Sequence, residues 1–242
     1  MKLNTVICGD IFNVMPKIED KSVDMILTDM PYNTTACSWD KEVIPLDKLW
    51  EGFKRIIKDN GAIVMTASQP FTSKLVMSNL KMFKYCWTWD KITAKGHLVA
   101  KIRPMQQTED ILVFGNKKIN YFPIMIDRPN NKIETTSECK RTEIMGGVSK
   151  GYKKTYTQWY PKTLLKFKTS RGLHPTQKPV ALMEYLIKTY TNKGDTVFDG
   201  FAGSGTTGVA CQNLNRKFIL IEKEQKYIDI IKKRLAQGVL NI

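Results

Sequence analysis

The sequence predicts an α/β fold with a mostly parallel central sheet. The first observation is a set of short apolar runs typical of buried strands, at 5–9, 23–28, 62–67, 195–199 and 217–222. The second is that segments with helical spacing alternate with these runs, as in parallel sheets covered by helices. The third is that the apolar runs 83–89 and 110–115 have no helix between them, which predicts an antiparallel pair at the sheet edge.

The predicted helices follow from apolar residues three and four positions apart. The first starts at Leu46 and is expected to close on Asn60-Gly61, a pair suited to a helix C-terminus. The next starts near Pro179 and stops at Gly194. The last is the amphipathic stretch 224–238, near the end of the chain.

The charge balance favours a polyanionic partner. The 242 residues include 38 Lys and Arg against 23 Asp and Glu, a net charge of +15. Segment 117–172 alone holds 13 Lys and Arg against 4 Asp and Glu, interleaved with aromatic residues. This mixture suits contacts to phosphates and bases, so 117–172 is predicted to be a basic target-recognition insertion between 1–116 and 173–242. A solvated charged loop with a small core of its own is the alternative.

Cysteine and histidine usage argues against disulfides and metal. The five cysteines are odd in number and none shows CxxC spacing, and the chain has two histidines. No structural zinc and no other metal site is expected. The N-terminus lacks an apolar signal stretch and no run approaches membrane-spanning length, so a cytoplasmic protein without a membrane partner is predicted.

A glycine-rich turn, "VFDGFAGSGTTGVAC" at 197–211, predicts a nucleoside-type cofactor. Glycines after an apolar strand let the backbone approach a ligand at the start of a helix, here opened by Thr206. Glu222 ends the next strand, where an acid can bind ribose hydroxyls. The GxxGxG spacing differs from the dinucleotide fingerprint, and no Lys-Ser or Lys-Thr follows as in a phosphate loop. S-adenosyl-L-methionine, which has no phosphates, fits better, although simple strand–helix packing would also use such glycines.

With this turn, the stretch "LTDMPYN" at 27–33 gives the chain a resemblance to the DNA amino-methyltransferases, which methylate an exocyclic nitrogen. "DMPY" at 29–32 resembles their Asp-Pro-Pro-Tyr catalytic motif, and "FAGSGT" at 201–206 resembles their cofactor loop. "HPTQKP" at 174–179 is similar to the element beside the cofactor's methionine moiety, and "CGD" at 8–10 to the strand end that contacts its adenine. The order of these motifs is similar to the permuted beta class. The chain departs from the pattern at Met30 and Gly200, where the family often has proline.

The resemblance implies a Rossmann-like S-adenosylmethionine-dependent methyltransferase fold and assigns roles. Asp29 and the carbonyl of Met30 would accept hydrogen bonds from the target amine, Pro31 would hold that carbonyl, and Tyr32 would stack on a flipped base. The implied cofactor-binding residues are Asp10, His174, Thr176, Lys178, Asp199, Phe201, Gly203, Ser204, Gly205, Thr206 and Glu222. The residues expected at DNA are Trp39, Lys153, Lys154 and Arg171. Without the cofactor loop, a structural role for this stretch would be an equal alternative, in which Asp29 caps a turn and Pro31 and Tyr32 pack against the protein.

In the family that the chain resembles, adenine enzymes usually open the motif with Asp or Asn and N4-cytosine enzymes often with Ser. The resemblance therefore implies, through Asp29, methyl transfer to N6 of adenine in a specific double-stranded DNA sequence. N4-cytosine DNA methyltransferases and RNA or protein N-methyltransferases remain alternatives, as do a nicotinamide oxidoreductase and a non-enzymatic DNA-binding module. A cytosine-C5 enzyme is excluded, because its nucleophilic cysteine follows a proline and none does here. A homodimer and a cognate restriction enzyme are further candidate partners.

Overall fold

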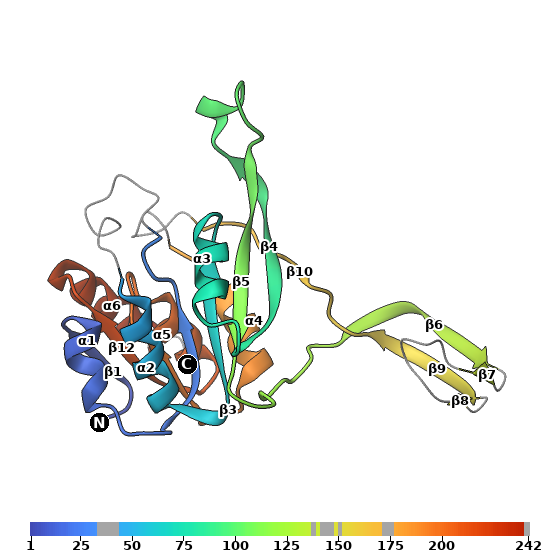
Figure 1. Ribbon diagram of the computed structural model, residues 1–242, viewed down its shortest axis with the longest axis horizontal. Helices are drawn as coiled ribbons and strands as arrows, with labels where there is room; N and C mark the ends of the chain where they lie inside the picture. Colours follow the sequence, from blue (N-terminus) through green and yellow to red (C-terminus); the bar gives the residue numbers. More distant parts are fainter. Residues whose placement is uncertain (33–43, 137–138, 141–147, 150–151, 171–176, 240–242) are drawn as a thin grey trace. The chain divides into compact units, whose positions relative to one another are not determined.

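A computed structural model describes residues 1–32, 44–136, 139–140, 148–149, 152–170 and 177–239 (Figure 1). The chain forms two compact units. The first unit combines Met1–Phe122 with Thr163–Ile242, and the second is Pro123–Lys162. No described helix is both long and apolar enough to span a membrane.

The first unit is built on an eight-stranded sheet. The strands are, in their order across it, β1 (Thr5–Cys8), β12 (Lys217–Glu222), β11 (Thr196–Asp199), β2 (Val23–Thr28), β3 (Ile57–Ala67), β5 (Gln106–Phe114), β4 (Phe83–Lys95) and β10 (Leu164–Lys166). Strand β5 runs antiparallel to β3 and β4, and the other described pairs are parallel. The mostly parallel α/β sheet predicted from the sequence is thereby confirmed.

Helices cover both faces of this sheet (Figure 1). They are α1 (Ile11–Val14), α2 (Leu46–Ile56), α3 (Phe71–Ser78), α4 (Val180–Tyr190), α5 (Thr206–Asn213) and α6 (Gln225–Val239), with 3-10 turns η1 (Met15–Lys17) and η3 (His97–Val99). Because side chains alternate along a strand, Ile26 of β2 packs with α1, α2 and α3, while Met25 and Leu27 pack with α4, α5 and α6. Two apolar cores therefore hold the carboxyl ends of the central strands in fixed positions.

Two predicted helix ends are wrong, and the structure gives the reasons. Helix α2 ends at Ile56, and Gly61 lies inside β3. A Cβ at Gly61 would approach the Asp24 carbonyl oxygen to 2.7 Å, so this glycine permits the close approach of β2 and β3 rather than capping a helix. Helix α4 ends at Tyr190, because Thr191 is extended, and Gly194 lies in the turn before β11.

The predicted antiparallel pair is real but does not form the edge of the sheet. Strand β4 pairs with β5, and β10 pairs with the other side of β4 in parallel. Strand β10 has three residues, of which Leu165 alone is buried. A strand this short carries no alternating pattern that sequence reading could detect.

The second unit is an antiparallel ribbon. Strand β6 (Ile126–Thr136) pairs with β9 (Tyr152–Trp159), and the short strands β7 (Cys139–Lys140) and β8 (Val148–Ser149) pair with each other. The unit spans fewer residues than the predicted insertion 117–172, and it contains eight Lys and Arg against four Asp and Glu. Five basic residues of that segment therefore lie outside the compact unit.

Candidate active site

The ends of two adjacent strands bring the glycine-rich turn and the "DMPY" stretch together. Strands β11 and β2 are parallel neighbours, so the residues that follow them leave the sheet at the same edge. Thr28 at the end of β2 donates a hydrogen bond of 2.8 Å to Oδ1 of Asp199 at the end of β11. Open α/β sheets bind ligands in this position, outside the carboxyl ends of their strands.

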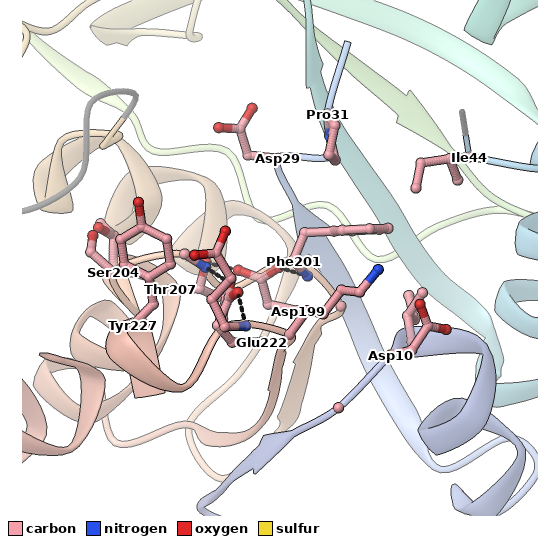
Figure 2. A pocket seen from close by; sticks show the side chains of 18 of the residues that line it. Asp10, Asp29, Pro31, Ile44, Asp199, Phe201, Ser204, Thr207, Glu222 and Tyr227 are labelled. Carbon is pink, nitrogen blue, oxygen red and sulfur yellow. Dashed lines mark hydrogen bonds between the residues drawn. The ribbon is translucent and has the colours of Figure 1, made fainter. Parts of the chain in front are cut away.

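A cavity of about 370 Å³ lies at this edge, within the size range of small-molecule sites. Figure 2 shows its lining, with Asp29 and Pro31 beside side chains of the cofactor loop and Glu222. The predicted residues that line it are Asp10, Asp29, Pro31, Lys178, Asp199, Phe201, Gly203, Ser204, Thr206 and Glu222. The structure thus joins the predicted catalytic stretch and most of the predicted cofactor residues in one site.

The charges around the cavity fit a cationic cofactor. Its lining includes the acidic residues Asp10, Asp29, Asp199, Glu222 and Glu224 and the basic residues Lys178 and Lys223. S-adenosylmethionine carries a sulfonium and an ammonium group, which this acidic lining attracts. Its ribose hydroxyl groups can also donate hydrogen bonds to the carboxylates. The phosphates of a nicotinamide dinucleotide would instead meet like charge. The residues present therefore fit S-adenosylmethionine.

The loop between β11 and α5 depends on two glycines with left-handed backbones. Gly203 has φ of 53° and Gly205 has φ of 77°, a region that L side chains rarely adopt. The Gly203 N–H donates to Oε2 of Glu222 at 2.8 Å, which fastens the loop to the end of β12. A Cβ at Gly205 would meet Ile231 of α6 at 2.8 Å, so Gly205 serves packing and does not line the cavity.

Protein groups already hold two of the predicted cofactor-binding carboxylates. Asp199 accepts from the Thr207 hydroxyl at 2.6 Å and the Phe201 N–H at 3.1 Å, in addition to Thr28. Burial raises the pKa of Asp199 to about 6, and these hydrogen bonds oppose the shift. Burial also raises the pKa of Glu222, whose Oε1 accepts from the Glu224 N–H at 2.9 Å. Both carboxylates therefore shape the loop that lines the cavity.

Asp10 combines a structural contact with its place in the lining. Its carboxylate accepts from the Phe12 N–H at 2.8 Å and caps α1. Capping satisfies one of the unpaired N–H groups at a helix start. The cap fixes the side chain at the end of β1, where it borders the cavity.

Three side chains surround the Asp29 carboxylate, which is 22% exposed. Its Oδ1 accepts a hydrogen bond from Thr66 of β3 and lies 2.6 Å from the Tyr32 hydroxyl. Its Oδ2 lies 2.7 Å from Nζ of Lys178. Because a carboxylate oxygen can accept about two hydrogen bonds, Oδ2 keeps acceptor capacity for a ligand.

Tyr32 and Met30 are both packed against the protein. One face of the Tyr32 ring stacks on Phe71, with centroids 5.3 Å apart and planes at 22°. Burial, and then the nearby Asp29 and Glu109, raise the pKa of Tyr32 well above its ordinary value, so its phenol is neutral. The Met30 side chain is 2% exposed and belongs to the core, which a second proline would not fill in the same way.

The main residue that sequence reading missed is Glu109 of β5. It is 7% exposed, and its Oε1 lies 3.0 Å from Nζ of Lys178. A carboxylate directly before the apolar run 110–115 was the available signal. Thr66, Gln177, Thr207 and Tyr227 offered no comparable pattern.

Six predicted residues lie either outside the described part of the chain or in the second unit. Trp39, Arg171, His174 and Thr176 lie outside the described residues. Lys153 and Lys154 lie on β9 in the second unit, and their DNA contacts stay a prediction.

Comparisons with known proteins agree with this geometry. A family model described as DNA methylase, covering N6 and N4 methyltransferases, matches residues 23–233. The chain belongs to this family. Its cofactor is S-adenosyl-L-methionine, and it is a DNA methyltransferase of the class that modifies N6 of adenine or N4 of cytosine.

Relatives match over nearly the whole chain. The type II methyltransferase M.HpaI of Haemophilus parainfluenzae is 29% identical over 95% of this chain and 73% of its own length. M1.MboII of Moraxella bovis is 26% identical over 95% of both proteins. The crystal structure of an M1.HpyAVI–SAM complex superimposes with a TM-score of 0.65 at 28% identity, covering 96% of this chain and 99% of that one. The cytosine-N4-specific PvuII methyltransferase shares the fold, with a TM-score of 0.68 at 17% identity over 95% of this chain and 85% of that one.

Proposed function

We propose that this methyltransferase acts on N6 of adenine in a specific sequence of double-stranded DNA, after the target base has left the helix. The observation that carries the proposal is the position of Asp29. Its carboxylate borders the same cavity as the glycine loop and Glu222, so an amine bound at Asp29 would lie beside the bound cofactor. M.HpaI and M1.MboII are type II methyltransferases, so a restriction enzyme that recognises the same sequence is a further expected counterpart.

The chemistry explains why a carboxylate is needed here. Bound S-adenosylmethionine supplies a methyl group activated by its sulfonium. The exocyclic amine of adenine is a weak nucleophile, because its lone pair is delocalised into the ring. Asp29 and the Met30 carbonyl each accept a hydrogen bond from this amine, which favours a tetrahedral nitrogen with an available lone pair. Preorganised acceptors of this kind need no reorganisation during the reaction.

Access to the cavity requires the base to leave the duplex. An exocyclic amine inside a base-paired helix is not reachable from a buried strand end, and enzymes acting on bases extrude the target nucleotide. Tyr32, whose ring also stacks on Phe71, is the residue expected to stack on the extruded base. After transfer, Asp29 accepts the proton that the methylated nitrogen releases.

Two basic parts of the chain support DNA as the substrate. Residues 92–105, which include the tip of the β4–β5 hairpin, contain three Lys and Arg and no Asp or Glu. Leu98 and Ile102 in this stretch are 88% and 83% exposed. Cations beside exposed apolar side chains suit phosphate contacts and insertion between bases. The second unit adds Arg128, which lies 4.9 Å from the Trp159 ring.

The target atom is tested directly with labelled cofactor. Duplex DNA is incubated with the protein and S-adenosylmethionine carrying a labelled methyl group, and the DNA is then digested to nucleosides. Label in N6-methyldeoxyadenosine supports the proposal, and label in N4-methyldeoxycytidine assigns the site to cytosine. Preferential labelling of single-stranded RNA would overturn the choice of nucleic acid.

A further inference from the structure

Asp29 belongs to a cluster of four charged side chains that is largely buried. Lys178 is 7% exposed, and its Nζ lies 2.7 Å from Oδ2 of Asp29 and 3.0 Å from Oε1 of Glu109. Lys91 lies 2.8 Å from Oε2 of Glu109. The cluster, defined as Asp29, Glu109, Lys178 and Lys91, thus alternates two carboxylates with two ammonium groups.

Two members of the cluster, Lys178 and Glu109, stay charged in spite of their burial. Burial disfavours a charged Lys178, but the Asp29 and Glu109 carboxylates outweigh it and raise the pKa of Lys178 above its ordinary value. Burial likewise opposes the charge on Glu109, but Lys178 and Lys91 outweigh it and lower the pKa of Glu109. Removing one partner from such a pair leaves an uncompensated buried charge.

We infer that Lys178 is a positioning residue for methyl transfer, which holds Oδ2 of the Asp29 carboxylate at the cavity. The inference rests on the proposed role of Asp29 as an acceptor for the target amine. Lys178 joins two segments, because it lies just before α4 whereas Asp29 follows β2, 149 residues earlier. Glu109 on β5 anchors the other side of the ammonium group.

The contacts show what each partner contributes. An ammonium group has three N–H donors, and Lys178 directs two of them at carboxylates. Thr66 and Tyr32 restrain Oδ1 of Asp29, whereas Lys178 restrains Oδ2. With both oxygens held, the carboxylate cannot rotate away from the amine.

Loss of Lys178 changes the charge around Asp29 as well as its geometry. The groups that face Asp29 are Thr66, Tyr32, Lys178, Glu109 and Asp199. Without the Lys178 ammonium, Lys91, which contacts Glu109, is the cation of the cluster that remains beside these carboxylates. Like charges close together favour a proton on one of the carboxylates. A proton taken up by this group of carboxylates weakens its acceptors, so the variant needs a higher pH to work.

The test uses the full chain and separates binding from transfer. Lys178→Met keeps the length of the side chain and removes its charge, Lys178→Arg keeps the charge, and Lys188→Met removes an exposed lysine from α4 as the control. Calorimetry gives the dissociation constant for S-adenosylmethionine. Single-turnover transfer at saturating cofactor and DNA gives the rate from about pH 6 to about pH 9.

We expect Lys178→Met to lower the transfer rate about 100-fold, the scale of a misplaced catalytic group, with cofactor affinity unchanged. Its rate rises with pH where the wild-type rate is flat. Lys178→Arg recovers part of the rate and the flat profile, and Lys188→Met matches the wild type. If Lys178→Met unfolds, Lys178→Met with Glu109→Gln removes one charge of each sign and is measured instead.

A different pattern overturns the inference. A weakened cofactor affinity, with a normal rate and pH profile at saturating cofactor, makes Lys178 a cofactor ligand. A normal rate in Lys178→Met or in the double variant shows that Asp29 needs no such support. Failure of the proposed function is distinguishable, because the wild type would then transfer no methyl group to DNA while still binding cofactor.

Discussion

Asp199→Asn should abolish a pH-dependent loss of stability that the buried carboxylate imposes on the protein. Asp199 lies at the end of β11, is 4% exposed and accepts hydrogen bonds from Thr28, Phe201 and Thr207. Asparagine keeps the Oδ1 acceptor for Thr28 and Phe201, and the Thr207 hydroxyl can rotate to accept from the new amide. The substitution therefore removes the charge while the hydrogen bonds persist.

The size of the effect follows from the pKa of Asp199. Burial raises that pKa to about 6, from an ordinary value of 3.8. Between these values the folded protein holds a proton that the unfolded chain has released, so the stability falls as pH rises from about 4 to about 6. One pKa unit corresponds to about 1.4 kcal/mol, so the shift of about two units costs the wild type about 3 kcal/mol at neutral pH.

Urea unfolding without added cofactor, repeated from about pH 4 to about pH 8, measures this difference. The free energy of unfolding of Asp199→Asn, relative to the wild type, should increase by about 3 kcal/mol across that range and level off above about pH 7. Asp47→Asn, an exposed position on α2, controls for the change in net charge. Parallel pH curves for Asp199→Asn and the wild type would refute the reasoning, since they would mean that the carboxylate does not titrate differently on folding.

Three further outcomes test the site and the DNA contacts. Gly203→Val places a side chain at a left-handed position, and Glu222→Ala releases the Gly203 N–H. Each variant should bind S-adenosylmethionine more weakly than the wild type, as measured by calorimetry. Unchanged affinity in both would exclude this loop as the cofactor site. Asp29→Ala should bind cofactor and DNA but lose about 3–4 kcal/mol of transition-state stabilisation in a single-turnover assay, so near-normal turnover would remove Asp29 from catalysis. Neutralising Lys153 and Lys154 should weaken binding to all DNA sequences alike. The slope of the logarithm of the binding constant against the logarithm of salt concentration should become shallower by about 0.9 for each lost phosphate contact. A slope equal to that of the wild type would place recognition elsewhere.

Local signals in the sequence were enough for the fold class and for most of the cavity. Apolar runs of strand length, separated by helical periodicity, predicted the parallel sheet because each pattern depends on neighbouring residues. The glycine turn at 200–205 and Glu222 were recognisable for the same reason. Helix ends were less secure, as Gly61 shows, because a glycine suits both a helix cap and the close contact that it makes with Asp24.

The surroundings of Asp29 were decided by the tertiary structure. Thr66 of β3 and Lys178, just before α4, contact Asp29, and Glu109 of β5 contacts Lys178. Thr66 and Glu109 lie near Asp29 because β2, β3 and β5 are consecutive in the sheet. Strand order is set by the packing of two apolar cores, and it leaves no mark in the residues beside each carboxylate. The sequence by itself therefore determined which residues were suited to the chemistry, whereas long-range strand pairing decided which charges face one another.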